Sequence, residues 1–139
     1  MASAPPQEGR TAPVTPFELV GGRPAVARLV NAFYDIVEQD PAFAELRDMH
    51  APDLSPMRDS LTGFLTAWMG GPRDWFEQNP GKCMMSLHKD LPIARLTSDQ
   101  WVTAMRQAIE RAGIEGQIGQ AMGDAFSQMA SGMIRRGNA

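Results

Sequence analysis

The chain has 139 residues, 43% of them hydrophobic, and a formal net charge of −3, which predicts one domain with a substantial core. The charge gives no electrostatic footprint for nucleic acid, and no apolar run approaches the ~20 residues of a membrane span. One cysteine excludes an internal disulfide framework, and the N-terminus lacks the features of a signal peptide, so we expect a cytoplasmic protein without nucleic-acid or membrane partners.

The first part of the chain is predicted to be a tail followed by a helix. Residues 1–16 contain four prolines and no apolar period, so we expect a disordered tail and a folded domain over residues 17–139. Pro24 suits a first helical position. Apolar residues then follow helical spacing over 26–37, and Asp40-Pro41 is expected to end this helix.

The middle of the chain is predicted to hold a short helical piece and a second amphipathic helix. The short piece is expected near 43–49. Ser55-Pro56 is typical of an N-cap followed by a first helical residue, and an apolar stripe follows over 57–68. Gly70-Gly71-Pro72 is a strong break. We expect 73–96 to form turns and loops around one brief helix that carries His88.

Two further helices are predicted in the last third of the chain. Thr97 and Gln100 have the spacing of a capping box, which would open a helix with an apolar face over 101–109. The last helix is expected over about 115–136, with apolar residues on one face. No segment shows a convincing run of alternation, so the sequence predicts an all-α fold.

Five local motifs, in register along the chain, resemble those of truncated haemoglobins of the second group, the O type of bacteria and plants. These motifs are, in chain order, Phe17–Gly22, Phe33-Tyr34, Phe64-Leu65 with Trp68 and Gly70-Gly71-Pro72, His88 at sixteen residues after Pro72, and Trp101 within 99–105. The resemblance covers most of residues 17–136. It implies a truncated globin-like two-over-two helical sandwich around haem b, iron protoporphyrin IX.

The resemblance assigns His88 as the axial ligand of the haem iron. A neutral imidazole nitrogen would bind the metal, and the other ring nitrogen would donate to a backbone carbonyl. The local sequence leaves an alternative open, because a histidine among methionines and leucines is also typical of a buried core residue.

The distal, ligand-binding residues implied by the resemblance are Tyr34, Trp101 and His50. We expect them to be hydrogen-bond donors to iron-bound oxygen. From the residues alone, Tyr34 and Trp101 could equally be core residues, and His50 could be a solvated residue before Pro52. Met57 is more typical of a packing residue or gate than of a sixth iron ligand.

The remaining haem pocket is expected to be apolar and rich in sulfur. Its predicted lining is Phe33, Met57, Leu61, Phe64, Trp75, Met84, Met85, Leu87, Leu91, Ile93 and Met105. Met85 and Leu87 stand where relatives usually carry two arginines that reach the haem propionates, and Leu91 replaces a phenylalanine. Lys82-Cys83 replaces the usual proline-rich approach to the histidine. The candidates to replace the arginines are Lys82, Lys89 and Arg58.

Three functions follow as hypotheses. The first is a haem protein that reversibly binds dioxygen, carbon monoxide, nitric oxide or a similar small ligand, as a monomer or weak homodimer. The second is a redox enzyme with nitric oxide dioxygenase or peroxidase-like activity. It would need an external reductase, because the chain has no flavin or nicotinamide motif. The third is a haem-free, globin-like interaction module.

Overall fold

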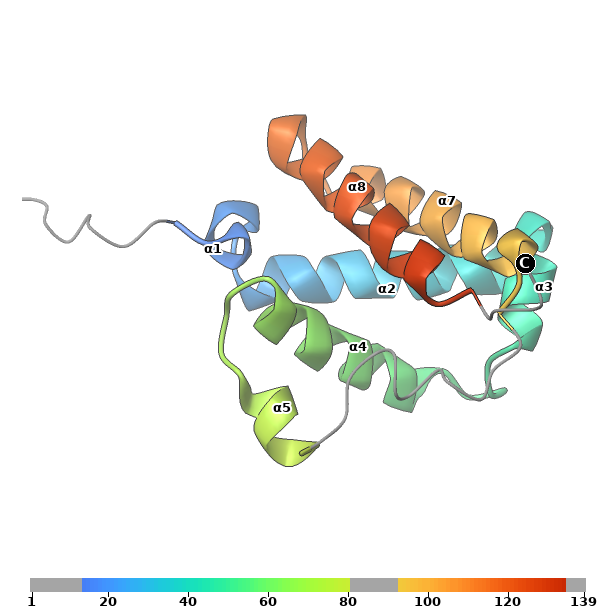
Figure 1. The fold of residues 1–139 in the computed structure, drawn as a ribbon, viewed down its shortest axis with the longest axis horizontal. Helices are drawn as coiled ribbons and strands as arrows, with labels where there is room; N and C mark the ends of the chain where they lie inside the picture. The colour runs from blue at the N-terminus through green and yellow to red at the C-terminus, as the bar shows by residue number, and fades with distance from the viewer. Residues whose placement is uncertain (1–13, 81–92, 135–139) are drawn as a thin grey trace, which may run out of the picture.

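The computed structural model describes residues 14–80 and 93–134, and every regular element in these ranges is helical (Figure 1). The elements are α1 (Pro16–Val20), α2 (Arg23–Gln39), the 3-10 turn η2 (Pro41–Phe43), α3 (Ala44–Asp48), α4 (Ser55–Trp68), α5 (Asp74–Gln78), α7 (Arg95–Arg111) and α8 (Gly116–Gly132). The all-α prediction is therefore confirmed. Within the same ranges, no helix has the length and apolar character needed to cross a membrane.

Helix α2 lies at the centre of the fold, between α4 on one side and the α7–α8 pair on the other (Figure 1). Helices α7 and α8 follow each other through a short connection and pack along their length. Helix α5 packs against α4, and α3 packs against α2 and α7. The candidate site described below is lined by residues of α2, α3, α4, α5, α7 and α8.

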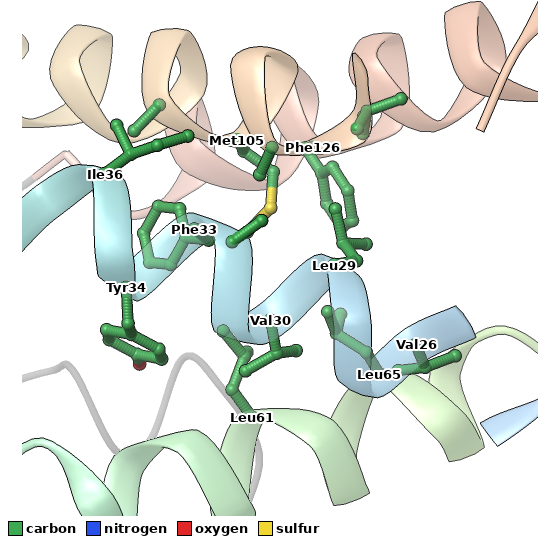
Figure 2. Packing of buried hydrophobic residues seen from close by; sticks show 14 of the residues in the cluster. Val26, Leu29, Val30, Phe33, Tyr34, Ile36, Leu61, Leu65, Met105 and Phe126 are labelled. Carbon is green, nitrogen blue, oxygen red and sulfur yellow. The ribbon is translucent and has the colours of Figure 1, made fainter. Parts of the chain in front are cut away.

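The core forms around the apolar stripe of α2 that the sequence predicts. Val26, Leu29, Val30 and Phe33 are completely buried. Figure 2 shows that residues of α4 approach this stripe from one side and residues of α7 and α8 from the other. Complete burial of one such side chain contributes about 1.5–3 kcal/mol, so this stripe stabilises the fold around the site.

The first helix begins earlier than expected. Thr15 caps α1: its hydroxyl accepts a hydrogen bond from the backbone N–H of Glu18, and its own N–H donates to the Glu18 carboxylate, both at 3.1 Å. This capping box gives hydrogen-bond partners to two backbone N–H groups, those of Thr15 and Glu18, which the start of a helix otherwise leaves without partners. Regular structure thus begins at Pro16, inside the range expected to be tail; residues 1–13 lie outside the described ranges.

The end of α4 shows why the predicted break needs glycine. Gly70 has a φ of +96°, a conformation that side chains with a Cβ rarely adopt. A Cβ on Gly71 would lie 2.8 Å from both the Phe17 ring and the Thr66 carbonyl oxygen. The two glycines therefore let the chain turn sharply while α1 packs against the end of α4.

Two predicted helix starts are wrong, one by a single residue and the other by three residues. Ser55 is the first residue of α4 rather than its N-cap, and its N–H donates to the Asp53 carboxylate at 3.0 Å. Helix α7 begins at Arg95, so Thr97 lies inside its first turn and bonds to the backbone of Ala94. Polar residues near a helix start form several alternative local hydrogen bonds, and spacing alone does not distinguish them.

Two further predictions differ from the structure: the end of the last helix and the loop predicted over residues 73–80. Helix α8 ends at Gly132, and residues 135–139 lie outside the described ranges. The region 73–80 contains a short helix, α5, which carries Trp75 and Phe76. The brief helix predicted around His88 falls in residues 81–92, which the structure does not describe.

Candidate functional site

A cavity of about 390 Å³ lies between α2, α3, α4, α7 and α8. Its volume falls within the roughly 300–1,000 Å³ typical of cofactor and small-molecule sites. Eight of the residues that the sequence predicted for the site line it: Tyr34, His50, Met57, Leu61, Phe64, Trp75, Ile93 and Trp101. The structure therefore brings together residues from segments that are up to 67 positions apart, 34 to 101.

Other predicted pocket residues are placed elsewhere or not described. Phe33 and Met105 are completely buried in the core behind the cavity and are not among its lining residues. Met84, Met85, Leu87, Leu91 and the candidate ligand His88 lie outside the described residues, as do Lys82, Cys83 and Lys89. The described lining thus includes Tyr34, His50 and Trp101, which are expected on the distal side, and leaves out the segment of His88.

Tyr34 lies on α2 and is 5% exposed. Edge-to-face contacts hold the ring in place: the centroid of Phe33 is 4.9 Å away and that of His50 is 5.9 Å away. Burial raises the pKa of Tyr34 from 10.0 to about 12, and the nearby Arg58 guanidinium partly opposes this shift. The hydroxyl therefore keeps its proton at neutral pH and can donate a hydrogen bond.

Trp101 lies on α7 and serves both as a core residue and as part of the cavity wall. Its ring packs edge-on against Phe33, with centroids 5.9 Å apart, and against Phe126 at 5.7 Å. The indole also lines the cavity. Its N–H can only donate, so Trp101 and Tyr34 supply two potential donors from different helices.

His50 follows α3 and lines the same cavity. Its Nδ1 lies 2.9 Å from the carbonyl oxygen of Leu46, four residues earlier. A carbonyl oxygen only accepts hydrogen bonds, so Nδ1 must carry the proton in this contact. The Nδ1 proton of His50 is therefore engaged by Leu46, and its expected role as a donor to a bound ligand stays a prediction.

Gln100 connects the helix of Trp101 to the segment of His50, a contact that the sequence did not reveal. Its Oε1 accepts from the N–H of Leu46 at 3.0 Å, and its Nε2 donates to the Glu45 carboxylate at 2.8 Å. The hydrogen bond from Gln100 lowers the pKa of Glu45. The glutamine predicted to cap α7 therefore joins α7 to α3 instead.

Arg58, a candidate partner for haem propionates, is held by α2. Its guanidinium donates to the Asn31 side chain at 3.0 Å, to Asp35 at 2.9 Å and to Glu38 at 3.4 Å. The guanidinium carbon also lies 5.7 Å from the centroid of the Tyr34 ring. These contacts occupy Arg58 at the outer side of Tyr34 and connect α4 to α2.

Trp75, on α5, is positioned by a glycine of α4. A Cβ on Gly63 would lie 2.9 Å from Cδ1 of the Trp75 ring, so only glycine allows the ring to approach α4 this closely. Trp75 also borders a second hollow of about 370 Å³, which Thr66 and Arg23 line. Within the described ranges, the buried Thr66 hydroxyl has no hydrogen-bond partner.

The composition of the main cavity fits a large, flat, apolar cofactor. Methionine, leucine and aromatic side chains form most of the wall, with a few polar groups between them, as in typical cofactor sites. Over 14–80 and 93–134, no three His, Cys, Asp or Glu side chains gather in a way that could hold a metal ion. The described donors thus suit haem with its own iron, and the axial ligand would come from the segment that contains His88.

Comparisons with known proteins agree with this geometry. The model of the Bacterial-like globin family matches residues 15–135. The chain is 27% identical to the group 2 truncated hemoglobin YjbI of Bacillus subtilis (strain 168) over 121 residues, or 87% of this chain and 89% of that protein.

Solved structures are similar over the same part of the chain. The cold-adapted truncated hemoglobin of Pseudoalteromonas haloplanktis TAC125 has a TM-score of 0.84 and 28% identity, and the match covers 88% of this chain and 99% of that one. A truncated haemoglobin from Bacillus subtilis has a TM-score of 0.79 and 25% identity, with 88% and 100% covered. These structures confirm the two-over-two sandwich. The chain is therefore a haem-binding globin of the bacterial-like family, and within it a truncated haemoglobin of the second group.

Proposed function

We propose that this globin reversibly binds dioxygen or a similar diatomic ligand on haem b, with Tyr34 and Trp101 as hydrogen-bond donors. The observation that carries the proposal is that a protonated tyrosine hydroxyl and an indole N–H line one apolar cavity from two different helices. Both groups are held by ring contacts, so they need little reorganisation when a ligand binds.

His88 is the proposed axial ligand of the iron. His88 would hold the haem iron, and the iron would supply the binding position for the diatomic ligand. The assignment of His88 rests on its spacing from the Gly-Gly-Pro break, because the residue lies outside the described ranges.

The expected result of two donors is slow oxygen release. Bound dioxygen carries partial negative charge, so each hydrogen bond to it contributes about 1–2 kcal/mol. A difference of about 1.4 kcal/mol corresponds to a tenfold change in an equilibrium constant. The related Bacillus subtilis structure is described as that of an oxygen-avid haemoglobin, which supports the same property here.

Absorption spectra of the reconstituted ferrous and carbonmonoxy forms test haem binding. We expect a Soret band, and we expect His88→Ala to lose haem or to change its spectrum grossly. A normal five-coordinate imidazole spectrum in that variant would contradict the axial assignment.

Stopped-flow oxygen release tests the donors. Tyr34→Phe keeps the ring and removes the hydroxyl, so release should become about tenfold faster for a loss of about 1.4 kcal/mol. Trp101→Phe is the matched variant for the indole N–H. Unchanged release in both variants would show that neither group stabilises the ligand.

A further inference from the structure

We propose that the methionines of the cavity wall are oxidation sites for hydrogen peroxide, and that their conversion to sulfoxides weakens the binding of haem. These cavity methionines are Met49, Met57, Met129 and Met133. The inference rests on the proposed haem site for the effect on haem, whereas the oxidation itself depends only on the chain.

The cavity methionines come from three separate parts of the fold. Met49 directly follows α3, and Met57 lies on α4, one turn before the buried Leu61. Met129 lies on α8, and Met133 directly follows that helix. Three parts of the chain thus contribute thioether side chains to the wall of one cavity.

Each cavity methionine is half-buried, and this position makes oxidation both possible and consequential. A peroxide molecule is only slightly larger than water, so it can reach a side chain that is not completely enclosed. The sulfoxide of a fully exposed methionine would remain in water and change little. A sulfoxide on this wall instead places a polar, chiral group in a mainly apolar site.

The methionines of the packed core provide an internal comparison. These core methionines are Met69, Met105 and Met122, which are 2%, 0% and 4% exposed. None of the three is among the described lining residues of the cavity, and Figure 2 shows Met105 among the packed core side chains. Because the folded protein encloses their sulfur atoms, they should react only when the protein unfolds. The remaining methionines, which lie outside the described ranges, are Met1, Met84 and Met85.

The oxidation is balanced with hydrogen peroxide as the only oxidant. A lone pair of the thioether sulfur forms an S–O bond with one peroxide oxygen, and the O–O bond breaks. The proton of the transferred oxygen passes to the leaving hydroxide, which becomes water. Sulfur loses two electrons and the peroxide gains them, so the products are one sulfoxide and one water molecule.

Sulfoxides should weaken haem binding because the wall would hold this flat cofactor mainly through apolar contacts. A sulfoxide oxygen that is covered by the haem loses its hydrogen bonds to water, which is unfavourable, so haem should dissociate about tenfold faster. Methionine sulfoxide reductases convert a sulfoxide back to the thioether, so treatment with them should restore the original rate.

Peptide mass spectrometry locates the oxidation sites. The haem-loaded protein is treated with increasing concentrations of hydrogen peroxide while circular dichroism confirms that it stays folded. The gain of one oxygen atom is then followed at each methionine. We expect the cavity methionines to react well before the core methionines. Equal reaction of the two groups, or faster reaction of the core methionines, would overturn the proposal.

Haem transfer to an acceptor protein measures the consequence. The oxidised protein is reloaded with fresh haem before the measurement, so damage to the cofactor itself does not contribute. Leucine has nearly the volume of methionine and is not oxidised, so a variant with leucine at all four cavity positions should transfer haem at the same rate before and after peroxide. The matched variant with leucine at the three core positions should remain sensitive. If the fourfold variant folds poorly, Met57→Leu combined with Met129→Leu should lose part of the effect.

The possible failures are distinguishable. Absence of a Soret band in the untreated protein would refute the proposed haem site and with it the effect on haem, while the order of oxidation would still be measured on the chain. Normal haem loading with unchanged haem transfer after oxidation of the cavity methionines would refute the effect on haem alone. Equal sensitivity of the fourfold leucine variant and the unmodified sequence would show that peroxide acts elsewhere and would also overturn the proposal.

Discussion

Gly63→Ala is expected to destabilise the protein, although alanine is the better helix former. The new Cβ would lie 2.9 Å from Cδ1, 3.2 Å from Cβ and 3.3 Å from Cγ of Trp75. Trp75 is 8% exposed, and its ring is held edge-on by Phe64 at 5.6 Å and by Phe76 at 5.2 Å. Rotating the ring alone does not relieve the clash, because the Trp75 Cβ belongs to the base of the side chain on α5.

Two opposing contributions set the change in the free energy of unfolding caused by Gly63→Ala. Replacing glycine by alanine inside a helix stabilises it by about 1 kcal/mol. Overpacking of a well-packed core costs about 1–3 kcal/mol, and the upper part of this range applies because backbone of α5 must shift. We therefore expect a net destabilisation of about 1–2 kcal/mol. For a chain of this size, each kcal/mol lowers Tm by about 4 °C.

Thermal and urea unfolding of the haem-loaded protein measure this effect. Gly132→Ala, at the end of α8, is the matched control, because a Cβ there meets nothing within 4 Å. The control should be neutral or slightly stabilising. If Gly63→Ala raised Tm by the full helix-propensity gain, the close approach of Trp75 to α4 would be wrong.

Three further outcomes follow from the site. Arg58→Met should lower the free energy of unfolding by about 1 kcal/mol or less, as expected for partly exposed ion pairs. It should leave haem affinity unchanged in a haem-transfer assay. A large loss of affinity would instead identify Arg58 as a propionate anchor. The raised pKa of Tyr34 contributes stability that is complete below pH 10.0 and is lost as the pH rises to about 12, so urea unfolding across this window should show a loss of roughly 3 kcal/mol that Tyr34→Phe lacks. Gln100→Leu leaves the part-buried N–H of Leu46 without its partner and should lower the free energy of unfolding by about 1–3 kcal/mol. Glu45→Ala removes only an exposed acceptor and should lower it less. Equal effects of the two variants in denaturant titrations would contradict the bridging role of Gln100.

The sequence predicted the helices whose apolar stripe is long and continuous. The stripe of α2 from Val26 to Val37 is buried as expected, because side chains that repeat at 3.6 residues must face one side of a helix. Trp68 was placed in the stripe of α4, yet it is 39% exposed and stacks on Phe126 with ring centroids 5.4 Å apart. At the end of a helix, a neighbouring helix decides burial more than the periodicity does.

The distal residues could be named from the motif resemblance, but the contacts that position them could not. Gln100 lies 54 positions from Leu46, and no local spacing predicts that contact. The proton position on His50 likewise depends on a backbone carbonyl, which no residue type encodes. The motif resemblance identified which side chains gather at the cavity, and the structure shows which groups hold them there.

The indole of Trp75 borders both the main cavity and the hollow beside Thr66. Because one rigid ring forms part of both walls, anything that displaces it changes the two spaces together. If a molecule bound in the hollow beside Thr66 changed the affinity of the main cavity for its ligand through this ring, linkage requires that ligand to change the affinity of the hollow by the same factor. Gly63, which lets Trp75 approach α4 this closely, therefore sets the position of a wall that both spaces share.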